Sequence, residues 1–199
     1  MNKTLSNDVS LALLNSAVAA LTSALEFSQP ADVALSNFFR AHKSGARDRA
    51  FIAEAVYAVI RRKRSLERLV SATGTSTTPR FLMLAALTQV LGFGVRQLDS
   101  ALRPAERQWL ADLKSVVSPE YSLAEQLDFP DWLSERMSSR MPVAELLSLA
   151  TALNTSAPLD LRVNILKVNA KAALAQLVGE KLPATACPYS PFGIRLAGK

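Results

Sequence analysis

The feature that most constrains the fold of this chain is a change in the spacing of its apolar residues near Asn154. Before that point, apolar residues recur at steps of three and four, which is the pattern of amphipathic helices. The first such run is Leu11, Leu14, Val18, Leu21 and Leu25. After that point, apolar and polar residues alternate from Leu159 to Ile165, which is the period of a half-buried strand. The chain therefore contains a long helical part followed by a short part with strands.

The helical pattern predicts helices over residues 8–27, 30–42, 47–70, 80–92, 95–102, 105–116, 130–140 and 143–153. Asn7 is the expected N-cap of the first helix, and Pro30 and Pro79 suit the first turns of two others. Gly92 is expected to end a helix as part of a C-cap and turn. We expect the helix over 47–70 to bend at a cluster of cations near its middle.

The last part of the chain predicts strands over residues 159–165, 184–187 and 193–196, with a helix over 171–179 between the first two. The predicted fold class is mainly α, with an all-α domain over residues 1–154 followed by a partial α+β (β-α-β) subdomain over 155–199. Three short strands make a marginal sheet, and an open edge lacks backbone partners. We therefore expect the residues after 155 to be the least stable part of the chain.

Composition excludes several classes of protein. A single cysteine, Cys187, excludes an internal disulfide, and a single histidine, His42, argues against a zinc site of ordinary composition. The uncharged run from Phe81 to Val95 is shorter than the roughly 20 residues that a membrane-spanning helix needs. These features predict a cytoplasmic protein that binds neither a metal nor a membrane.

Positive charge is concentrated in residues 38–68, which hold nine basic and three acidic residues, a surplus of +6 that equals the formal net charge of the whole chain. The other 14 basic and 14 acidic residues cancel. A localised positive field favours a polyanionic partner, of which nucleic acid is the leading candidate. The residues predicted to make this contact, with RNA as the partner that the resemblance described below implies, are Arg40, Lys43, Arg47, Arg49, Arg61, Arg62, Lys63 and Arg64.

The four consecutive cations that begin at Arg61 are the strongest candidates, because four successive residues on a helix cannot all face a core. The alternative is a solvated helix end, where cations complement the helix dipole. Asp48 can instead pair with a neighbouring arginine as a structural ion pair. Arg162, Asn164 and Lys167 are further candidates near the first strand, with an ordinary solvent face as the alternative.

Cys187 is expected to be a strand residue and not a catalytic nucleophile, because no base or anion-binding loop accompanies it. Five aromatic residues are expected to lie in the core, with stacking on nucleic-acid bases as the alternative: Trp109, Trp132, Phe38, Phe39 and Phe93. Trp132, after Pro130, is expected to pin a linker to the helical domain.

Three stretches of the chain, in this order, resemble the RsmB-type (Sun/Fmu) family of S-adenosylmethionine-dependent RNA cytosine-C5 methyltransferases. Residues 39–57, with the basic run from Arg61, resemble the opening of that family's NusB-like helical domain. Phe129-Pro130-Asp131-Trp132-Leu133 is similar to the family's (H/F)P-x-W-L linker signature. Residues 158–167 and 188–196 resemble the start of the small RNA-binding subdomain that precedes the catalytic domain.

The resemblance implies the RNA-binding N-terminal portion of an rRNA methyltransferase, with small-subunit ribosomal RNA as the partner. The family's cofactor loop and its two catalytic cysteines have no counterpart in this sequence, so we expect this chain alone to bind no cofactor and to be inactive. S-adenosylmethionine is implied only for a full-length family member. The chain is expected to be a monomer.

Two other functions stay open. The first is a stand-alone NusB-like RNA-binding or transcription-factor module, which would have no use for residues 158–196. The second is a helical protein–protein adaptor with a fortuitously basic helix. An adaptor predicts that any RNA affinity barely changes with salt, whereas phosphate contacts predict an affinity that falls steeply as salt rises.

Overall fold

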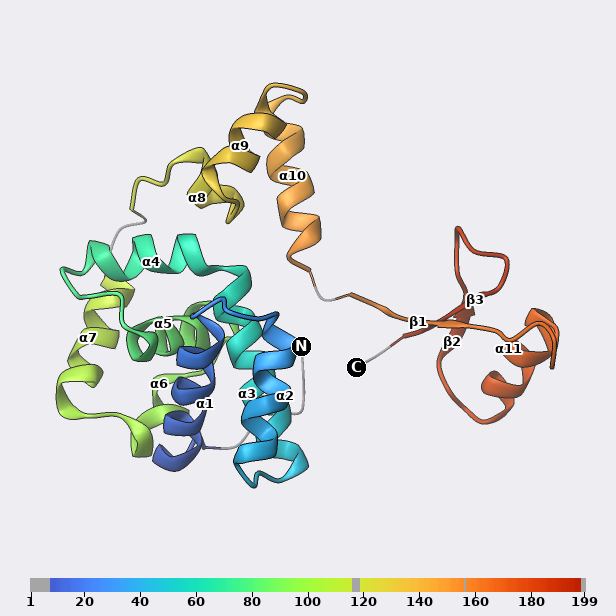
Figure 1. Cartoon of the computed structure of the whole chain (residues 1–199), viewed down its shortest axis with the longest axis horizontal. Coiled ribbons are helices and arrows are strands. Elements are labelled where there is room, and N and C mark those ends of the chain that lie inside the picture. Colours follow the sequence, from blue (N-terminus) through green and yellow to red (C-terminus); the bar gives the residue numbers. More distant parts are fainter. Residues whose placement is uncertain (1–7, 116–118, 156, 198–199) are drawn as a thin grey trace. The chain divides into compact units, whose positions relative to one another are not determined.

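The computed structural model describes residues 8–115, 119–155 and 157–197 (Figure 1). The chain divides into two compact units between Leu153 and Asn154. The helices of the first unit are α1 (Leu11–Ala24), α2 (Ala31–Ala41), α3 (Ala46–Arg61), α4 (Lys63–Ala72), α5 (Pro79–Ala85), α6 (Val95–Leu98), α7 (Pro104–Ser115), α8 (Leu123–Leu127), α9 (Asp131–Ser138) and α10 (Val143–Leu153). The second unit contains β1 (Leu159–Arg162), α11 (Ala170–Gly179), β2 (Ala184–Ala186) and β3 (Gly193–Leu196). The predicted fold class, mainly α with a partial β-containing subdomain, is confirmed.

The main core of the helical unit forms around the packing of α1 against α3. α1 buries Leu14, Ala17 and Leu21, and α3 buries Ile52 and Val56, at the spacing expected of amphipathic helices. α1 begins after Ser10, whose side-chain oxygen accepts a hydrogen bond from the backbone N–H of Leu13. The predicted N-cap, Asn7, lies outside the described residues.

A buried ion pair joins three helices of this core. The Arg80 guanidinium of α5 donates to both carboxylate oxygens of Glu106 on α7, and also to the side-chain oxygen of Asn15 on α1 at 2.9 Å. Burial by itself would raise the pKa of the Glu106 carboxyl, but the hydrogen bonds from Arg80 and from the backbone N–H of Arg103 outweigh it, so that the pKa is lowered. Glu106 therefore stays ionised inside the protein, where Arg80 supplies its counter-charge and hydrogen-bond donors.

The predicted helix over 47–70 is two helices, because the chain breaks at Arg62 (φ −116°, ψ 24°) between α3 and α4. The cause lies far away in the sequence. The carboxylate of Asp128 accepts hydrogen bonds from the backbone N–H of Ser65 at 2.8 Å and from its hydroxyl at 2.9 Å. Asp128 thus caps the first turn of α4, where backbone N–H groups lack partners within the helix.

The remaining differences in the helical unit are local. The predicted helix over 80–92 is α5 followed by a π-helical turn over Ala86–Val90, and Gly92 ends it with a φ of +74°, as the glycine predicted. Helix α8 was not predicted, although Ser122 and Glu125 form a capping box that signals its start. Helices α8 to α10 share a smaller core of Leu127, Leu146 and Ala150.

Two predictions for aromatic residues have opposite outcomes. Trp109 is buried, and its indole N–H donates to the side-chain oxygen of Thr73 at 2.9 Å, as expected of a core tryptophan. The prediction that Trp132 pins the linker to the helical domain is wrong, because Trp132 is 64% exposed to solvent. The linker is held instead by Asp128 and its neighbours.

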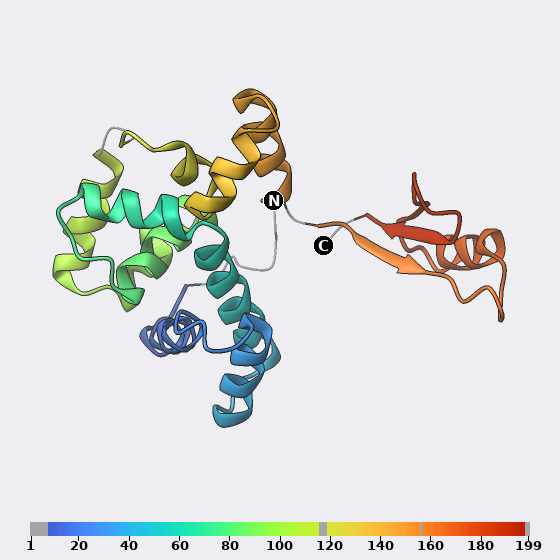
Figure 2. The same ribbon diagram turned by 45° about the horizontal axis from the view of Figure 1, so that its top comes forward.

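The C-terminal unit is a three-stranded antiparallel sheet with the strand order β1-β3-β2. β1 and β3 run in opposite directions side by side (Figure 2). Helix α11 connects β1 to β2, so β3 is inserted between the two strands of a β-α-β unit. Among the described residues of this unit, the buried hydrophobic side chains are Val163 and Ile194, and Leu159 and Leu161 are exposed instead of half-buried.

Candidate nucleic-acid interface

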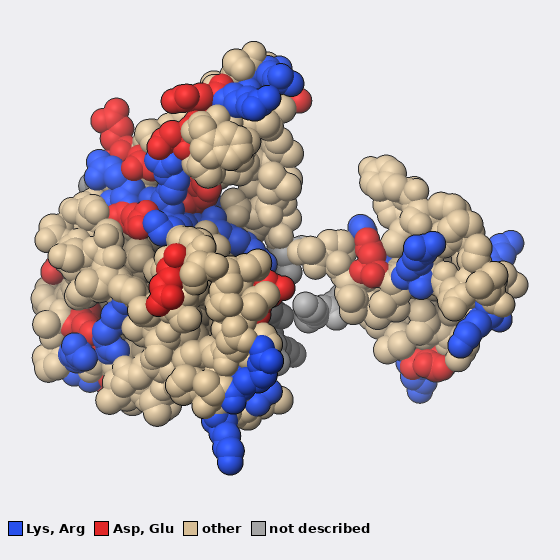
Figure 3. Space-filling model, viewed as in Figure 1, with Lys and Arg blue, Asp and Glu red and all other residues tan. Residues whose placement is uncertain are grey.

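The cations predicted to bind RNA in the helical unit are divided between two places. Arg40, Lys43, Arg47, Arg49 and Arg61 belong to α2, α3 and the turn between them. Arg62, Lys63 and Arg64 lie at the start of α4. On the face seen in Figure 3, the basic atoms over α4 are interleaved with acidic ones, whereas those at the α2–α3 turn have no acidic atoms beside them. The structure therefore shows two environments instead of the single cationic surface that the sequence predicted.

The cations of α4 are occupied by contacts within the protein. Arg62 pairs with Asp128 at 3.5 Å, Lys63 with Glu67 at 2.6 Å, and Arg64 with Asp131 at 2.7 Å. Arg64 also donates to the carbonyl oxygen of Phe129 at 3.0 Å. The contacts of Arg62 and Arg64 hold residues 128–131 against α4, whereas the Lys63–Glu67 pair lies within α4 itself. RNA contact by these three residues stays a prediction, and their charge is already balanced by carboxylates.

Three of the other cations, Arg40, Lys43 and Arg49, border a groove of about 590 Å³ between α2 and α3. On α3, Arg49, Ala53, Tyr57 and Arg61 follow one another at four-residue intervals, which places them in one line along the helix. Arg49, Ala53 and Tyr57 line the groove from α3, and Phe39, Arg40 and Lys43 line it from the end of α2 and the turn. Arg40, Lys43, Arg49 and Arg61 are exposed, and among the described residues none of them pairs with a carboxylate.

Two of these arginines rest on aromatic rings. The guanidinium carbon of Arg49 lies 5.8 Å from the centre of the Phe39 ring, and that of Arg61 lies 5.5 Å from the centre of the Tyr57 ring. The Arg49 side chain is also fixed by a hydrogen bond to the carbonyl oxygen of Ser44 at 2.9 Å. Stacking on a ring leaves the guanidinium edges free to donate hydrogen bonds, so the groove presents oriented donors with a net positive charge.

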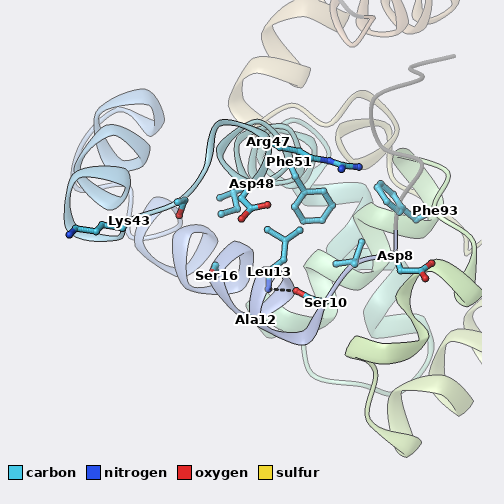
Figure 4. Close-up of a pocket in the computed structure, with 13 residues that line it drawn as sticks. Asp8, Ser10, Ala12, Leu13, Ser16, Lys43, Arg47, Asp48, Phe51 and Phe93 are labelled. Carbon is cyan, nitrogen blue, oxygen red and sulfur yellow. Dashed lines mark hydrogen bonds between the residues drawn. The ribbon is translucent and has the colours of Figure 1, made fainter.

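A second cavity, of about 340 Å³, lies between the starts of α1 and α3 (Figure 4). Phe51 and Phe93 form part of its wall, with ring centres 5.8 Å apart in an edge-to-face contact. Its lining contains two basic residues, Lys43 and Arg47, and two acidic residues, Asp8 and Asp48. Because these charges cancel, this cavity is a weaker candidate for a polyanion than the α2–α3 groove.

The residues of the C-terminal unit that were predicted to bind RNA do not share one face of a strand. Arg162 is the last residue of β1, whereas Asn164 and Lys167 lie in the turn that follows. The side-chain oxygen of Asn164 accepts a hydrogen bond from the backbone N–H of Leu166 at 3.1 Å, which shapes that turn. Arg162 and Lys167 are exposed.

The parts of the chain that the structure describes contain no cluster of three or more His, Cys, Asp or Glu side chains that could hold a metal ion. In the same residues, no helix is long and apolar enough to cross a membrane.

Comparison with known proteins tests the resemblance found in the sequence. Residues 129–199 match the model of the RsmF/B-like methyltransferase ferredoxin-like domain. The chain is 30% identical over 199 residues to a probable ribosomal RNA small subunit methyltransferase B of Synechocystis. The resemblance of the chain to the RsmB-type methyltransferase family, found in the sequence, is thereby confirmed.

The match covers 84% of this chain and 44% of the Synechocystis protein. In structure, the chain is similar to the crystal structure of PH0851, with a TM-score of 0.56 and 16% identity, over 96% of this chain and 49% of PH0851. At that identity the likeness shows a shared fold. The chain thus spans about half the length of the relatives that it matches. Any link between this chain and the activity of a whole family member is therefore a proposal.

Proposed function

We propose that this chain forms the RNA-binding part of an S-adenosylmethionine-dependent RNA cytosine-C5 methyltransferase that acts on small-subunit ribosomal RNA. The observation that carries the proposal is the α2–α3 groove, whose exposed cations lack carboxylate partners among the described residues. The family membership supplies the reaction class, since the Synechocystis relative is a probable ribosomal RNA methyltransferase.

The groove suits an RNA backbone for electrostatic reasons. Arg40, Lys43 and Arg49 line it against a single acidic residue, Asp32, and Arg61 lies on the neighbouring Tyr57 ring. Each phosphate neutralised by such a cation releases a counterion, which steepens the dependence of affinity on salt by about 0.7 per contact on single-stranded RNA. A planar guanidinium can donate two parallel hydrogen bonds to one phosphate.

Within this proposal, the role of these residues is to bind and orient RNA. S-adenosylmethionine would supply the methyl group in the family's reaction. We propose a NusB-like RNA-gripping role for the helical unit and a second RNA contact for the C-terminal unit, whose sequence matches the family's ferredoxin-like domain. That match favours the methyltransferase reading over a stand-alone NusB-like module, because such a module has no use for residues 158–196.

The proposal is tested by RNA binding to the full chain at several salt concentrations. The triple variant Arg40→Gln, Arg49→Gln, Arg61→Gln removes two cations that line the groove and a third, Arg61, that lies beside it on the Tyr57 ring. Its matched control removes three exposed arginines elsewhere on the helical unit, Arg96→Gln, Arg136→Gln, Arg140→Gln, with the same change in net charge. Affinity for a fragment of small-subunit ribosomal RNA is measured by fluorescence anisotropy, and helicity by circular dichroism.

We expect the groove variant to lose at least about tenfold in affinity and to have a salt slope shallower by about 2, while the control changes little. Equal losses in both variants would show that only net charge matters and would refute the groove. RNA affinity that is unchanged by salt in the wild type would favour the protein adaptor. Unaltered helicity in both variants is required for either result to count.

A further inference from the structure

The C-terminal unit has one sheet face that carries polar and charged side chains. Side chains alternate along a strand, so Asp160 and Arg162 of β1 lie on the same face. Arg195 of β3 pairs with Asp160 across the strands, and its guanidinium donates two hydrogen bonds of 2.8 Å to the Asp160 carboxylate. The buried Ile194 lies on the opposite face, because it is adjacent to Arg195 in the strand.

Beside this polar face is a cavity of about 260 Å³ that the loop between β2 and β3 helps to form. It is lined by Arg162, Cys187, Arg195 and the loop residues Pro188, Tyr189 and Ser190, among others. Tyr189 is 97% exposed, so its ring packs against almost nothing in the protein. A fully exposed aromatic ring at the mouth of a concave site is available to a ligand.

The loop that carries Tyr189 is held in place. The backbone N–H of Cys187 donates to the carbonyl oxygen of Gly193 at 3.0 Å, and that of Gly193 donates to the carbonyl oxygen of Ser190 at 3.1 Å. Pro188 and Pro191 restrict the backbone on either side of Tyr189. A ring presented by a restrained loop loses little conformational entropy when it binds.

The charges at this cavity favour an anionic ligand. Arg195 is neutralised by Asp160, whereas Arg162 is exposed and has no carboxylate partner among the described residues. Residues 154–199 as a whole hold six basic and two acidic residues, which gives this short segment a charge of +4. The cavity therefore offers one available guanidinium and one aromatic ring in a positive surrounding field.

Cys187 does not make this a nucleophilic site. Partial burial raises the pKa of its thiol, and the negative charge of Asp160 raises that pKa further, so the thiolate is disfavoured. The cavity has the chemistry of binding.

We propose that this cavity receives one unpaired RNA nucleotide, with its base stacked on Tyr189 and its phosphate bound by Arg162. This inference rests on the proposed RNA-binding function and assigns it a contact in the second unit. Base–aromatic stacking and guanidinium–phosphate hydrogen bonding are the contacts by which proteins hold single-stranded RNA. A base inside a duplex has no free face for Tyr189, so the site selects unpaired nucleotides.

The test uses the full chain and a single-stranded RNA of about 12 nucleotides that contains the fluorescent base 2-aminopurine. Tyr189→Ala removes the ring, and Tyr189→Phe keeps it. Leu166→Ala is the matched control, because Leu166 is 93% exposed in the same unit and its truncation removes an apolar side chain of no assigned role. A duplex of the same sequence is measured in parallel.

We expect Tyr189→Ala to lower affinity for the single strand by roughly 5- to 150-fold and to abolish stacking-induced quenching of 2-aminopurine, in line with about 1–3 kcal/mol per stacked base. Tyr189→Phe and Leu166→Ala should bind like the wild type, and duplex binding should not change. Arg162→Gln should flatten the salt slope by about 0.7, whereas Arg162→Lys should keep it.

Two outcomes would overturn the inference. If Tyr189→Ala binds single strands as tightly as the wild type while the α2–α3 triple variant is impaired, RNA binding stands and this site fails. If Tyr189→Ala weakens single-strand and duplex binding equally, Tyr189 does not stack on a base. Absence of RNA binding in the wild type would instead refute the proposed function itself.

Discussion

At the scale of single residues, Asp128 decides how the basic run of this chain is used. Its carboxylate is 2% exposed and accepts hydrogen bonds from Ser65, twice, and from Arg62. Its backbone has a φ of +56°, a conformation that aspartate and asparagine adopt more readily than other residues with a side chain. One residue therefore ends α8 through its backbone, and caps α4 and neutralises Arg62 through its buried side chain.

Replacing Asp128 tests this role. We expect Asp128→Ala to lower the free energy of unfolding by about 2–4 kcal/mol, because Arg62 and Ser65 lose a buried charged acceptor and alanine disfavours a positive φ. Denaturant unfolding monitored by circular dichroism measures the loss. Asp131→Ala is the control, since its side chain is 70% exposed and its pairing with Arg64 is worth no more than about 1 kcal/mol. Equal effects of both substitutions would contradict a capping role for Asp128.

At the scale of elements, the break at Arg62 separates residues that the sequence presents as one cluster. Arg61 ends α3, whereas Lys63 and Arg64 occupy the first turn of α4. Cations at a helix start oppose the helix dipole, and the carboxylates of Glu67 and Asp131 offset that repulsion. The basic residues of α4 thus hold neighbouring segments by ion pairs, whereas Arg61 of α3 has no carboxylate partner among the described residues.

Two glycines of the C-terminal unit give a matched prediction at this scale. A Cβ added to Gly193 would lie 2.8 Å from both Cβ and Sγ of Cys187, whereas one added to Gly179 would meet nothing within 4 Å. Gly193→Ala should therefore destabilise the unit by about 1–3 kcal/mol, and Gly179→Ala, in α11, should be neutral or stabilise it by up to about 1 kcal/mol.

Amide hydrogen exchange of β3 and α11 measures both changes. The prediction fails if the amides of β3 are equally protected in Gly193→Ala and in the wild type. It also fails if Gly179→Ala is the more damaging of the two substitutions.

At the scale of the whole molecule, the two units differ in how much they bury. The helical unit has a core that extends over α1 to α7, and α8 to α10 add a smaller one. In the described part of the C-terminal unit, α11 contains no buried residue and all four residues of β1 are exposed. Burial of apolar area is the main source of folding free energy, so the second unit gains less stabilisation from burial than the first.

We therefore expect the amides of β1 and α11 to exchange faster than those of α1 and α3. Local opening should be at least about tenfold more frequent, which corresponds to about 1.4 kcal/mol. Native-state hydrogen exchange with mass spectrometry on the full chain measures this ratio. Equal protection in both units would contradict the prediction that the residues after 155 are the least stable part.

The sequence by itself determined most of the helical and strand segments, although not α8 or the break at Arg62, because side-chain periodicity and Gly and Pro signals act over a few neighbouring residues. It also showed the resemblance to the RsmB-type family, and it located the surplus charge between Phe38 and Arg68. The tertiary structure alone decided which of those cations lack carboxylate partners, since Asp128 and Asp131 come from a segment more than 60 residues away from Arg62 and Arg64. The same reason explains why the sequence predicted Arg162 but not the cavity that it shares with Tyr189, since the two residues become neighbours only when β3 inserts between β1 and β2.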